Sequence, residues 1–263
     1  RQAMSDIAAR FYGFPGMRMK VYGVTGTNGK TTTCHLLKKI LETRGRKVGL
    51  ITSSSYDNGA EVFAADRTTP ESLDTQRLLY QMIQNGCTHA VVEVSSHALV
   101  LHRVDNITFQ VAVYTNITRD HLDFHKKMDK YLEAKALLLG KLDESFSSAV
   151  INIDQPEFRN LMRDVRTSRM SYSLKDQTAD VYCRDYSIGP EKTDFELDTP
   201  MGSRMVHLKL PGKFNLINAI GAAAGGLASG VDIDHVVAGL NAACPVPGRF
   251  QHVDGGQPFA VYL

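Results

Sequence analysis

The sequence predicts an α/β fold, with a mostly parallel β-sheet flanked by helices and a small appended antiparallel sheet. Two patterns support this prediction. From Met19 to Ile153, short β-branched runs alternate with longer helical patterns, which is typical of repeated strand–helix–strand units and a parallel sheet. From about Ser168 to Leu210, short alternating segments are separated by turn residues, which indicates antiparallel strands.

Each element follows from its local pattern. Apolar runs predict parallel strands at Met19–Val24, Lys47–Thr52, His89–Val94, Val111–Asn116 and Ala149–Ile153. Helical spacing predicts helices near Thr31–Arg44, Glu71–Asn85 (with Pro70 at its start), Lys130–Lys141, Lys213–Leu227 and Ile233–Ala242. Alternation predicts antiparallel strands at Asp180–Tyr186, Asp194–Leu197 and Met205–Leu210. The last two helices are rich in Ala and Gly, so they can pack closely on the sheet.

Composition excludes several classes of protein without choosing a function. The 263 residues are 43% hydrophobic and can form one large core or two modest ones. The net charge of +2 and the lack of a Lys/Arg run give no indication of a nucleic-acid partner. The four cysteines have no paired spacing, and no apolar run reaches the roughly 18 residues of a membrane span. We therefore expect a reduced, cytoplasmic protein without membrane insertion.

The most informative segment joins the first predicted strand to the first helix. It reads Gly-Val-Thr-Gly-Thr-Asn-Gly-Lys-Thr-Thr-Thr over Gly23–Thr33. Glycines let backbone N–H groups converge on a polyphosphate, while Lys30 can reach the β- and γ-phosphates and the Thr31 hydroxyl can bind Mg²⁺. The spacing is a variant of the P-loop, because Val24 stands where the strict pattern has glycine. We therefore predict a P-loop-type sheet that binds ATP or GTP. The residues expected at the nucleotide are Gly26, Thr27, Asn28, Gly29, Lys30, Thr31 and Thr32.

Polar residues follow two further predicted strands, where the ligand of an open parallel sheet is bound. The third strand ends in Glu93-Val94-Ser95-Ser96-His97, and the fourth continues into Thr115–His125. Glu93 and a threonine hydroxyl suit Mg²⁺, whereas a histidine is an unusual ligand for so hard a cation. His121 and His125 also have the four-residue spacing of a zinc pair, although the sequence offers no obvious third ligand.

Taken in order, these segments resemble the Mur ligases, and most closely those that add the third amino acid to a UDP-N-acetylmuramoyl-dipeptide. The matching motifs span nearly the whole chain. They are Gly23–Thr33, Thr68–Ser72, Glu93–Leu99, His102–Val104, Thr115–His125, Tyr131–Lys135, Gly212–Asn218 and Pro247–Phe250. The phosphate loop alone would indicate only the wider superfamily, which includes folylpolyglutamate and cyanophycin synthetases.

The resemblance implies an ATP-dependent ligase. In that family the substrate carboxylate attacks the γ-phosphate of ATP, and the incoming amine opens the resulting acyl phosphate to form an amide. By resemblance, Lys30, His121 and Lys135 are the catalytic residues. Mg²⁺ would be held by Thr31, Glu93, His121 and a carbamylated Lys135. The attacking carboxylate and the γ-phosphate are both anions, so lysine and metal would be needed to neutralise their charge.

The resemblance also implies the remaining contacts. The muramoyl-dipeptide would be held by Thr68, Thr69, Ser95 and Arg103. The ATP site would be completed by Asn215 and Asn218 on the adenine side and by Arg249 near the phosphates. The partners implied are UDP-N-acetylmuramoyl-dipeptide and an amino acid whose identity the sequence leaves open, and the protein is expected to be monomeric.

The family pattern divides the chain into three parts. We expect residues 1–18 to be a linker from a preceding domain, 19–252 to be the central ATP-binding domain including the antiparallel sheet at 168–210, and 253–263 to begin a following domain. On this interpretation the chain alone would be inactive. A regulatory GTPase is disfavoured because the guanine-reading [NT]-K-x-D and the D-x-x-G switch are both missing from the sequence. A non-catalytic nucleotide-binding domain stays open, although the presence of Glu93, His121 and Lys135 together argues against it.

Overall fold

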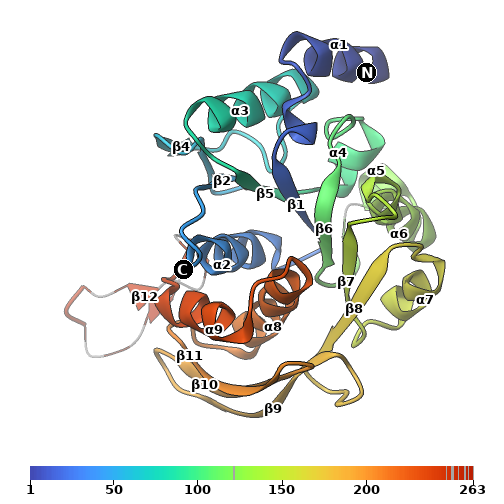
Figure 1. The fold of residues 1–263 in the computed structure, drawn as a ribbon. Coiled ribbons are helices and arrows are strands. Elements are labelled where there is room, and N and C mark those ends of the chain that lie inside the picture. Colours follow the sequence, from blue (N-terminus) through green and yellow to red (C-terminus); the bar gives the residue numbers. More distant parts are fainter. Residues whose placement is uncertain are drawn as a thin grey trace.

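The α/β fold predicted from the sequence is confirmed in a computed structural model (Figure 1). The structure describes residues 1–120, 122–246, 248–249, 252–253, 255–257, 259 and 261–262. Within these residues, one sheet of 11 strands has the order β11-β10-β9-β8-β7-β6-β1-β5-β2-β3-β4, and β12 and β13 form a separate pair. Its central strands are parallel, and helices cover both faces.

The elements alternate along the chain as the sequence pattern indicates. The strands are β1 (Lys20–Thr25), β2 (Val48–Ile51), β3 (Ser55–Asp57), β4 (Val62–Ala64), β5 (His89–Glu93), β6 (Phe109–Tyr114), β7 (Ser148–Asn152), β8 (Ser168–Ser173), β9 (Val181–Ile188), β10 (Thr193–Thr199), β11 (Gly202–Leu208), β12 (His252–Val253) and β13 (Val261–Tyr262). The α-helices are α1 (Gln2–Phe11), α2 (Lys30–Glu42), α3 (Ser72–Gln84), α4 (Ser96–Val100), α5 (Leu122–His125), α6 (Met128–Ala136), α7 (Pro156–Asp164), α8 (Lys213–Ala228) and α9 (Ile233–Ala242). Short 3₁₀ turns lie at Pro15–Met17 and Leu139–Lys141.

The strand order creates a topological switch at β1. This strand pairs in parallel with β5 on one side and with β6 on the other. After β1 the chain forms β2, β3 and β4, and then returns to place β5 between β1 and β2. It next crosses β1 to add β6, β7 and β8 on the other side. The loops after β1, β5 and β6 therefore meet at one edge of the sheet, which is where open α/β sheets bind their ligands.

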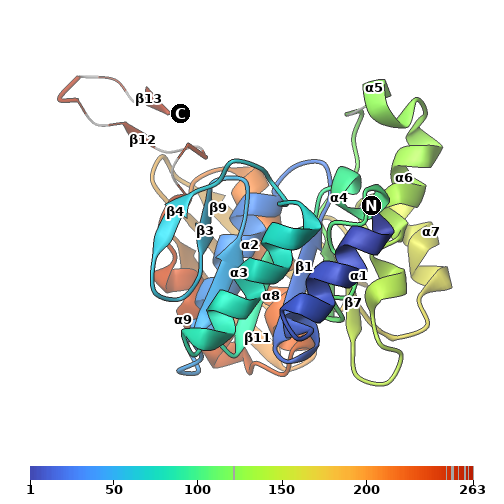
Figure 2. The same ribbon diagram turned by 90° about the horizontal axis from the view of Figure 1, so that it is seen from above.

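Two helical layers bury two apolar clusters. On one face, α2, α8 and α9 cover residues such as Tyr22, Val91 and Val113. On the other, apolar residues of α3, α6 and α7 cover residues such as Val21, Val92 and Ala112. The sheet curves so that β9, β10 and β11 extend around α8 and α9, while α1 lies against α3 at the outside (Figures 1 and 2). Alternate residues of each central strand therefore enter different clusters, as strand geometry requires.

The structure corrects the predicted extent of the antiparallel region. That region was expected from residue 168, but β8 pairs with β7 in parallel, and β9 also joins β8 in parallel over two residue pairs. Only β9, β10 and β11 are mutually antiparallel, and they continue the main sheet. The first two residues of β8 are exposed, and its serines are interspersed with larger residues, so its pattern resembles that of an antiparallel strand.

Other differences concern short elements. The helix expected at Lys130–Lys141 is divided into α6 and the 3₁₀ turn at Leu139–Lys141. Residues 1–18, interpreted as a linker, include α1, whose small residues Ser5, Ala8 and Ala9 are buried. The sequence pattern missed several short elements, each of nine residues or fewer: α4, α5, α7, β3, β4, β8 and β12. None of the helices in the described part of the chain has the length and apolarity that a membrane span requires.

Candidate functional site

The phosphate loop connects β1 to α2 and depends on two glycines. Gly26 has φ 150° and Gly29, the N-cap of α2, has φ 81°. A Cβ atom at Gly26 would lie 1.9 Å from Oγ1 of Thr115, and one at Gly29 would lie 2.1 Å from Oδ1 of Asn218. Any larger residue would therefore collide with the segment after β6 or with α8, which hold the loop from two sides.

Residues after β6 hold this loop in place. The backbone N–H of Asn28 donates to Oδ1 of Asn116 at 2.9 Å, and Nδ2 of Asn116 donates back to the carbonyl of Asn28 at 2.9 Å. Thr115 also donates to the Asn28 carbonyl, at 2.7 Å. The backbone N–H of Thr27 donates to the Asn116 carbonyl at 2.8 Å. The protein thus orders the loop through its own hydrogen bonds.

Lys30 begins α2 and is held over the loop. Its Nζ donates to the carbonyl of Thr27 at 2.8 Å and lies 3.9 Å from Oε1 of Glu93. Burial lowers the pKa of Lys30 below its ordinary value, and the charge of Glu93 acts in the opposite direction. A cation so placed beside the helix N-terminus can neutralise a polyphosphate.

Glu93 gathers oxygen atoms from three elements. At the end of β5, its side chain is 3% exposed, and Oε2 accepts hydrogen bonds from Oγ1 of Thr31 and from the backbone N–H of Ser53, both at 2.9 Å. The hydroxyls of Thr31 and Ser53 are also 2.9 Å apart. The next residue of α2, Thr32, is buried. One carboxylate and two hydroxyls make a set of hard oxygen donors, which suits Mg²⁺ when phosphate oxygens complete the coordination.

Lys135 reaches the same loop from α6. Its side chain is 1% exposed, its Nζ donates to the carbonyl of Gly26 at 2.7 Å, and it lies 4.3 Å from the centre of the Tyr131 ring. The hydroxyl of Tyr131 is 3.2 Å from Oγ1 of Thr27. Burial, followed by the charge of Lys30, holds the pKa of Lys135 well below its usual value. Lys135 therefore reaches neutral, nucleophilic form at lower pH than an exposed lysine.

The histidine predictions have different outcomes. His121, predicted as a catalytic residue and metal ligand, lies outside the described residues. His125 is buried, and its Nε2 lies 2.9 Å from the hydroxyl of Ser96. In the part of the chain that the structure describes, no group of three or more His, Cys, Asp or Glu side chains is arranged to hold a metal ion. The zinc alternative therefore receives no support from the described residues.

The structure brings three of the predicted substrate residues to the end of β5. Oγ1 of Thr69 donates to the Glu93 carbonyl at 2.7 Å and accepts from the N–H of Ser95 at 3.1 Å. Ser95 is the N-cap of α4. Thr68 is half-buried in the same loop as Thr69. The Thr69 hydroxyl thus contacts the backbone of Glu93, whose carboxylate faces the phosphate loop, and Ser95 lies two residues after Glu93.

Arg103 joins this group through the loop before α3. Its Nη1 donates to the carbonyl of Thr69 at 3.1 Å, and its Nη2 donates to Oε1 of Glu71 at 2.7 Å. Arg67 donates to the same oxygen at 2.7 Å. Nε of Arg103 is buried and has no hydrogen-bond partner among the described residues. Arg103 and Arg67 therefore share the Glu71 carboxylate, and the half-exposed guanidinium of Arg67 can also meet an anionic ligand.

Of the three residues expected around the rest of the nucleotide, two lie at the phosphate loop and one is bonded within the start of α8. Asn218, near the start of α8, contacts the phosphate loop at Gly29. Asn215 is buried, and its Nδ2 donates to the carbonyl of Pro211 at 2.8 Å, so its amide stabilises the start of α8. Nη2 of Arg249 lies 3.1 Å from Oγ of Ser53 and 3.5 Å from Oγ1 of Thr31.

Sequence reasoning assigned no role to three residues of the site. Ser53 binds Glu93, Asn116 anchors the phosphate loop and Tyr131 contacts both Thr27 and Lys135. Ser53 and Asn116 are each the second residue after a parallel strand, β2 and β6, which is a signal that the sequence did contain. Tyr131 has no such signal, because its place depends on how α6 packs.

Comparison with known proteins identifies relatives of this site and fold. Residues 24–226 match the model of the Mur ligase middle domain. The chain is 40% identical over 267 aligned residues to the UDP-N-acetylmuramoyl-L-alanyl-D-glutamate–2,6-diaminopimelate ligase of Bacillus cereus, covering 100% of this chain and 54% of the relative. The chain thus spans about half the length of the curated relatives it matches.

Solved structures give the same result at the level of the fold. A UDP-N-acetylmuramoyl-L-alanyl-D-glutamate–2,6-diaminopimelate ligase superposes with a TM-score of 0.80 at 29% identity, covering 90% of this chain and 48% of the other. The MurF ligase of Thermotoga maritima, solved in complex with ADP, superposes with a TM-score of 0.76 at 21% identity, covering 96% and 55%. At 21% identity, the similarity to the MurF ligase shows a shared fold and nothing more.

Proposed function

Because this chain belongs to the Mur ligase family through that family's middle domain, we propose that it binds ATP and Mg²⁺ for an amide-forming ligase. The longer protein would add the third amino acid to UDP-N-acetylmuramoyl-dipeptide during peptidoglycan synthesis. The observation that carries this proposal is the contact of Glu93 with Thr31, beside Lys30. A carboxylate at that place turns a phosphate loop into a site for phosphate and metal together.

The described residues fit Mg²⁺ by the chemistry of their donors. Glu93 and Thr31 would hold one ion, and a carbamate on Lys135 would approach a second. His121, which the family resemblance implies as a further ligand, lies outside the described residues. Once bound, Mg²⁺ would withdraw charge from the phosphoryl oxygens as a Lewis acid. Imidazole is the exception to the oxygen ligands, so His121 is the weakest member of the set.

Carbamylation of Lys135 is supported by its environment. Its lowered pKa leaves a neutral amine that can attack CO₂; the new N–C bond yields a carbamate, and one proton is released. A carbamate carries negative charge and two oxygens, so it would reverse the repulsion between Lys135 and Lys30. The aromatic face of Tyr131 would then lie against an anion, which requires a bound cation nearby.

The other residues would act by binding and orientation. Lys30 would neutralise the charge that develops as the substrate carboxylate attacks the γ-phosphate and ADP leaves. Arg249 lies beside the Thr31 and Ser53 hydroxyls and would bind the same phosphates. Asn218, and less directly Asn215, would border the adenine side. Thr68, Thr69, Ser95 and Arg103 would hold the muramoyl-dipeptide, with the arginine at a carboxylate or phosphate.

Calorimetry with ATP and GTP in the presence of Mg²⁺ tests the nucleotide proposal. We expect the chain to bind ATP more tightly than GTP. Lys30→Ala should weaken ATP binding by about 3 kcal/mol, the size typical of losing one charge-stabilising group.

Lys39→Ala is the matched control, because Lys39 lies on the same helix but is exposed and paired with Glu42. It should leave ATP binding unchanged. Equal ATP affinity in the original chain and Lys30→Ala would contradict the proposed role of the loop, as would equal affinity for GTP.

A further inference from the structure

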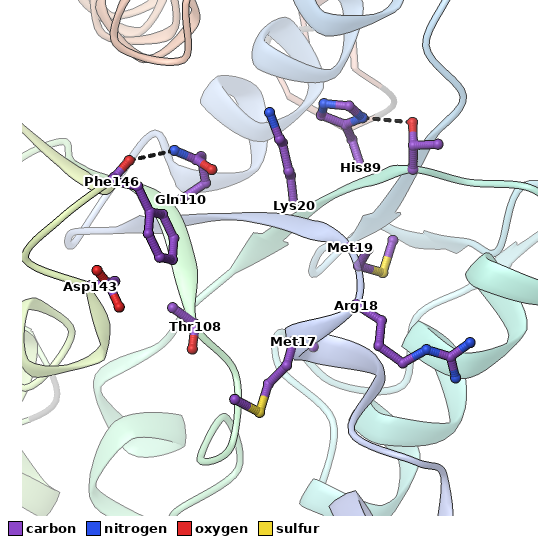
Figure 3. A pocket seen from close by; sticks show the side chains of 11 residues that line it. Met17, Arg18, Met19, Lys20, His89, Thr108, Gln110, Asp143 and Phe146 are labelled. Carbon is purple, nitrogen blue, oxygen red and sulfur yellow. Dashed lines mark hydrogen bonds between the residues drawn. The ribbon is translucent and has the colours of Figure 1, made fainter.

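A phosphate loop holds only one end of a nucleotide, and the base needs a surface of its own. A cavity of about 550 Å³ opens where β1, β5 and β6 begin, at the opposite end of the sheet from the phosphate loop (Figure 3). Because β1 lies between the two ends, a nucleotide whose phosphates are at the loop cannot place its base in this cavity. The base must therefore lie on the surface that borders the loop.

The first turn of α8 provides such a surface. Asn218 lies against the loop, since its Oδ1 is 2.1 Å from where a Cβ of Gly29 would stand. Phe214 precedes Asn218 by four residues, so both side chains lie on the same face of α8. The rise of the helix places Phe214 about 6 Å beyond Asn218 along the axis. A ribose likewise separates the base of a nucleotide from its phosphates, so a base can reach Phe214 while the phosphates stay at the loop.

Phe214 has the accessible surface that a base would cover. It is 86% exposed, more than any other large apolar residue in the described part of the chain. The two asparagines expected on the adenine side, Asn215 and Asn218, are 7% and 5% exposed. Asn215 also donates its amide to the carbonyl of Pro211. The asparagines therefore present little surface to a base, and the contact area of this turn belongs to the phenylalanine ring.

A planar aromatic ring suits this position for a physical reason. Bases stack on aromatic side chains because every base has a flat π-face, so the contact tolerates any base. Stacking also removes the apolar ring from water, which is favourable. Such a contact would hold the base of a nucleotide without selecting ATP over GTP.

We propose that Phe214 stacks on the base of the bound nucleotide and supplies affinity for its nucleoside part. This inference rests on the proposed function, because it requires phosphates bound at the loop. Lys30 would hold the phosphates and Phe214 the base. A ligand that has the phosphates but no base therefore separates the two contributions.

Calorimetry with ATP and with inorganic tripolyphosphate, both in the presence of Mg²⁺, makes this separation. We expect Phe214→Ser to weaken ATP binding about tenfold, within the range typical of base stacking, and to leave tripolyphosphate binding unchanged. Phe214→Tyr keeps the ring and should bind ATP as the original chain does, whereas Phe214→Leu keeps apolar area without a ring and should not. Phe11→Ser is the matched control, because Phe11 is 77% exposed on α1, and it should leave both affinities unchanged.

Fluorescence gives a direct signal for the contact. The chain contains no tryptophan, so Phe214→Trp places a single indole on the first turn of α8. ATP should quench its fluorescence by stacking, and tripolyphosphate should not. Phe11→Trp should respond to neither ligand.

The two probes also distinguish two kinds of failure. If the original chain binds neither ATP nor tripolyphosphate, the proposed nucleotide site is wrong and the stacking contact is wrong with it. The phosphate site stands and the stacking contact alone is overturned if Phe214→Ser keeps full ATP affinity, if it loses affinity for both ligands equally, or if ATP leaves the fluorescence of Phe214→Trp unchanged.

Discussion

At the scale of single residues, Lys135 shows how burial changes the chemistry of a side chain. An exposed lysine on a helix is protonated and unreactive at neutral pH. Lys135 is 1% exposed and lies close enough to Lys30 for the two charges to repel, so its pKa falls well below the usual value. Its hydrogen bond to Gly26 also fixes the amine against the phosphate loop.

We predict that Lys135 forms a carbamate when bicarbonate is present. The amine reacts only when neutral, so the carbamate should increase as pH rises through the lowered pKa of Lys135 and become protonated amine again below it. Carbon NMR with ¹³C-bicarbonate measures this directly. The signal should vanish in Lys135→Ala and persist in Lys130→Ala, a control on the same helix whose lysine is exposed and paired with Glu133. A signal that survives Lys135→Ala would refute the assignment.

At the scale of elements, the phosphate loop depends on close approach between β1, β6 and α8. Gly29 has both a positive φ and a neighbour, Asn218, within 2.1 Å of where a Cβ would stand. Gly45 has φ 69° but no atom within 4 Å of that position. A substitution at Gly45 would therefore test backbone strain alone, whereas one at Gly29 would test strain and a steric collision together.

We predict that Gly45→Ala costs about 1 kcal/mol of unfolding free energy, from backbone strain alone. Gly29→Ala should cost more, because it adds the collision with Asn218. Urea unfolding of both variants measures the difference. Combining Gly29→Ala with Asn218→Ser should recover part of that difference. Equal costs for Gly29→Ala and Gly45→Ala would show that α8 does not restrict the loop.

The first residue of β5 makes stability depend on pH. Burial, then the charges of Arg46 and Lys20, lowers the pKa of His89 to about 4 from 6.5. The folded chain keeps this ring neutral, whereas the unfolded chain protonates it below pH 6.5. Its contribution to stability is therefore complete above pH 6.5 and is lost as pH falls toward 4.

We predict that the free energy of unfolding decreases by up to about 3 kcal/mol between pH 6.5 and 4 through His89 alone. Urea unfolding across this range, for the original chain and for His89→Gln, isolates the effect as the difference between their pH profiles. Parallel profiles would mean that His89 titrates normally in the folded chain.

At the scale of the whole molecule, the curved sheet brings the proposed nucleotide and metal ligands together at one edge. Loops after β1, β2, β5 and β6 meet there, and α8 approaches from the concave side (Figure 1). The curated relatives are about twice as long as this chain. The proposed reaction also needs an amine held in line and water excluded, and such positioning can supply on the order of 7–11 kcal/mol of a barrier.

We predict that the 263-residue chain alone releases ADP slowly and forms no tripeptide at a useful rate. The assay contains UDP-N-acetylmuramoyl-Ala-Glu, ATP, Mg²⁺ and each candidate amino acid, and mass spectrometry follows the product. An acyl phosphate exposed to water would hydrolyse instead of meeting the amine. Tripeptide formation at a rate near that of the full-length relatives would contradict this expectation.

The α/β fold could be predicted from the sequence, and so could the glycine-rich loop between β1 and α2. Local patterns suffice for these features: strand and helix periods are visible in short windows, and a glycine-rich turn before Lys30 has one common use. The position of Glu93 near the phosphate loop could also be predicted, because the parallel strands of one sheet end at the same edge and Glu93 ends β5. The roles of the candidate site residues stay predictions.

Local sequence patterns could not predict which distant groups meet, and this required the folded structure. It brought Ser53 to Glu93, Asn116 to the phosphate loop and Tyr131 to Lys135. It also made β8 a parallel strand and left a nitrogen of His89 unpaired beside Lys20. These features depend on strand order and on the burial that packed helices impose, which are long-range properties. Residues far apart in sequence acquire their pKa values and contacts only after the sheet has assembled.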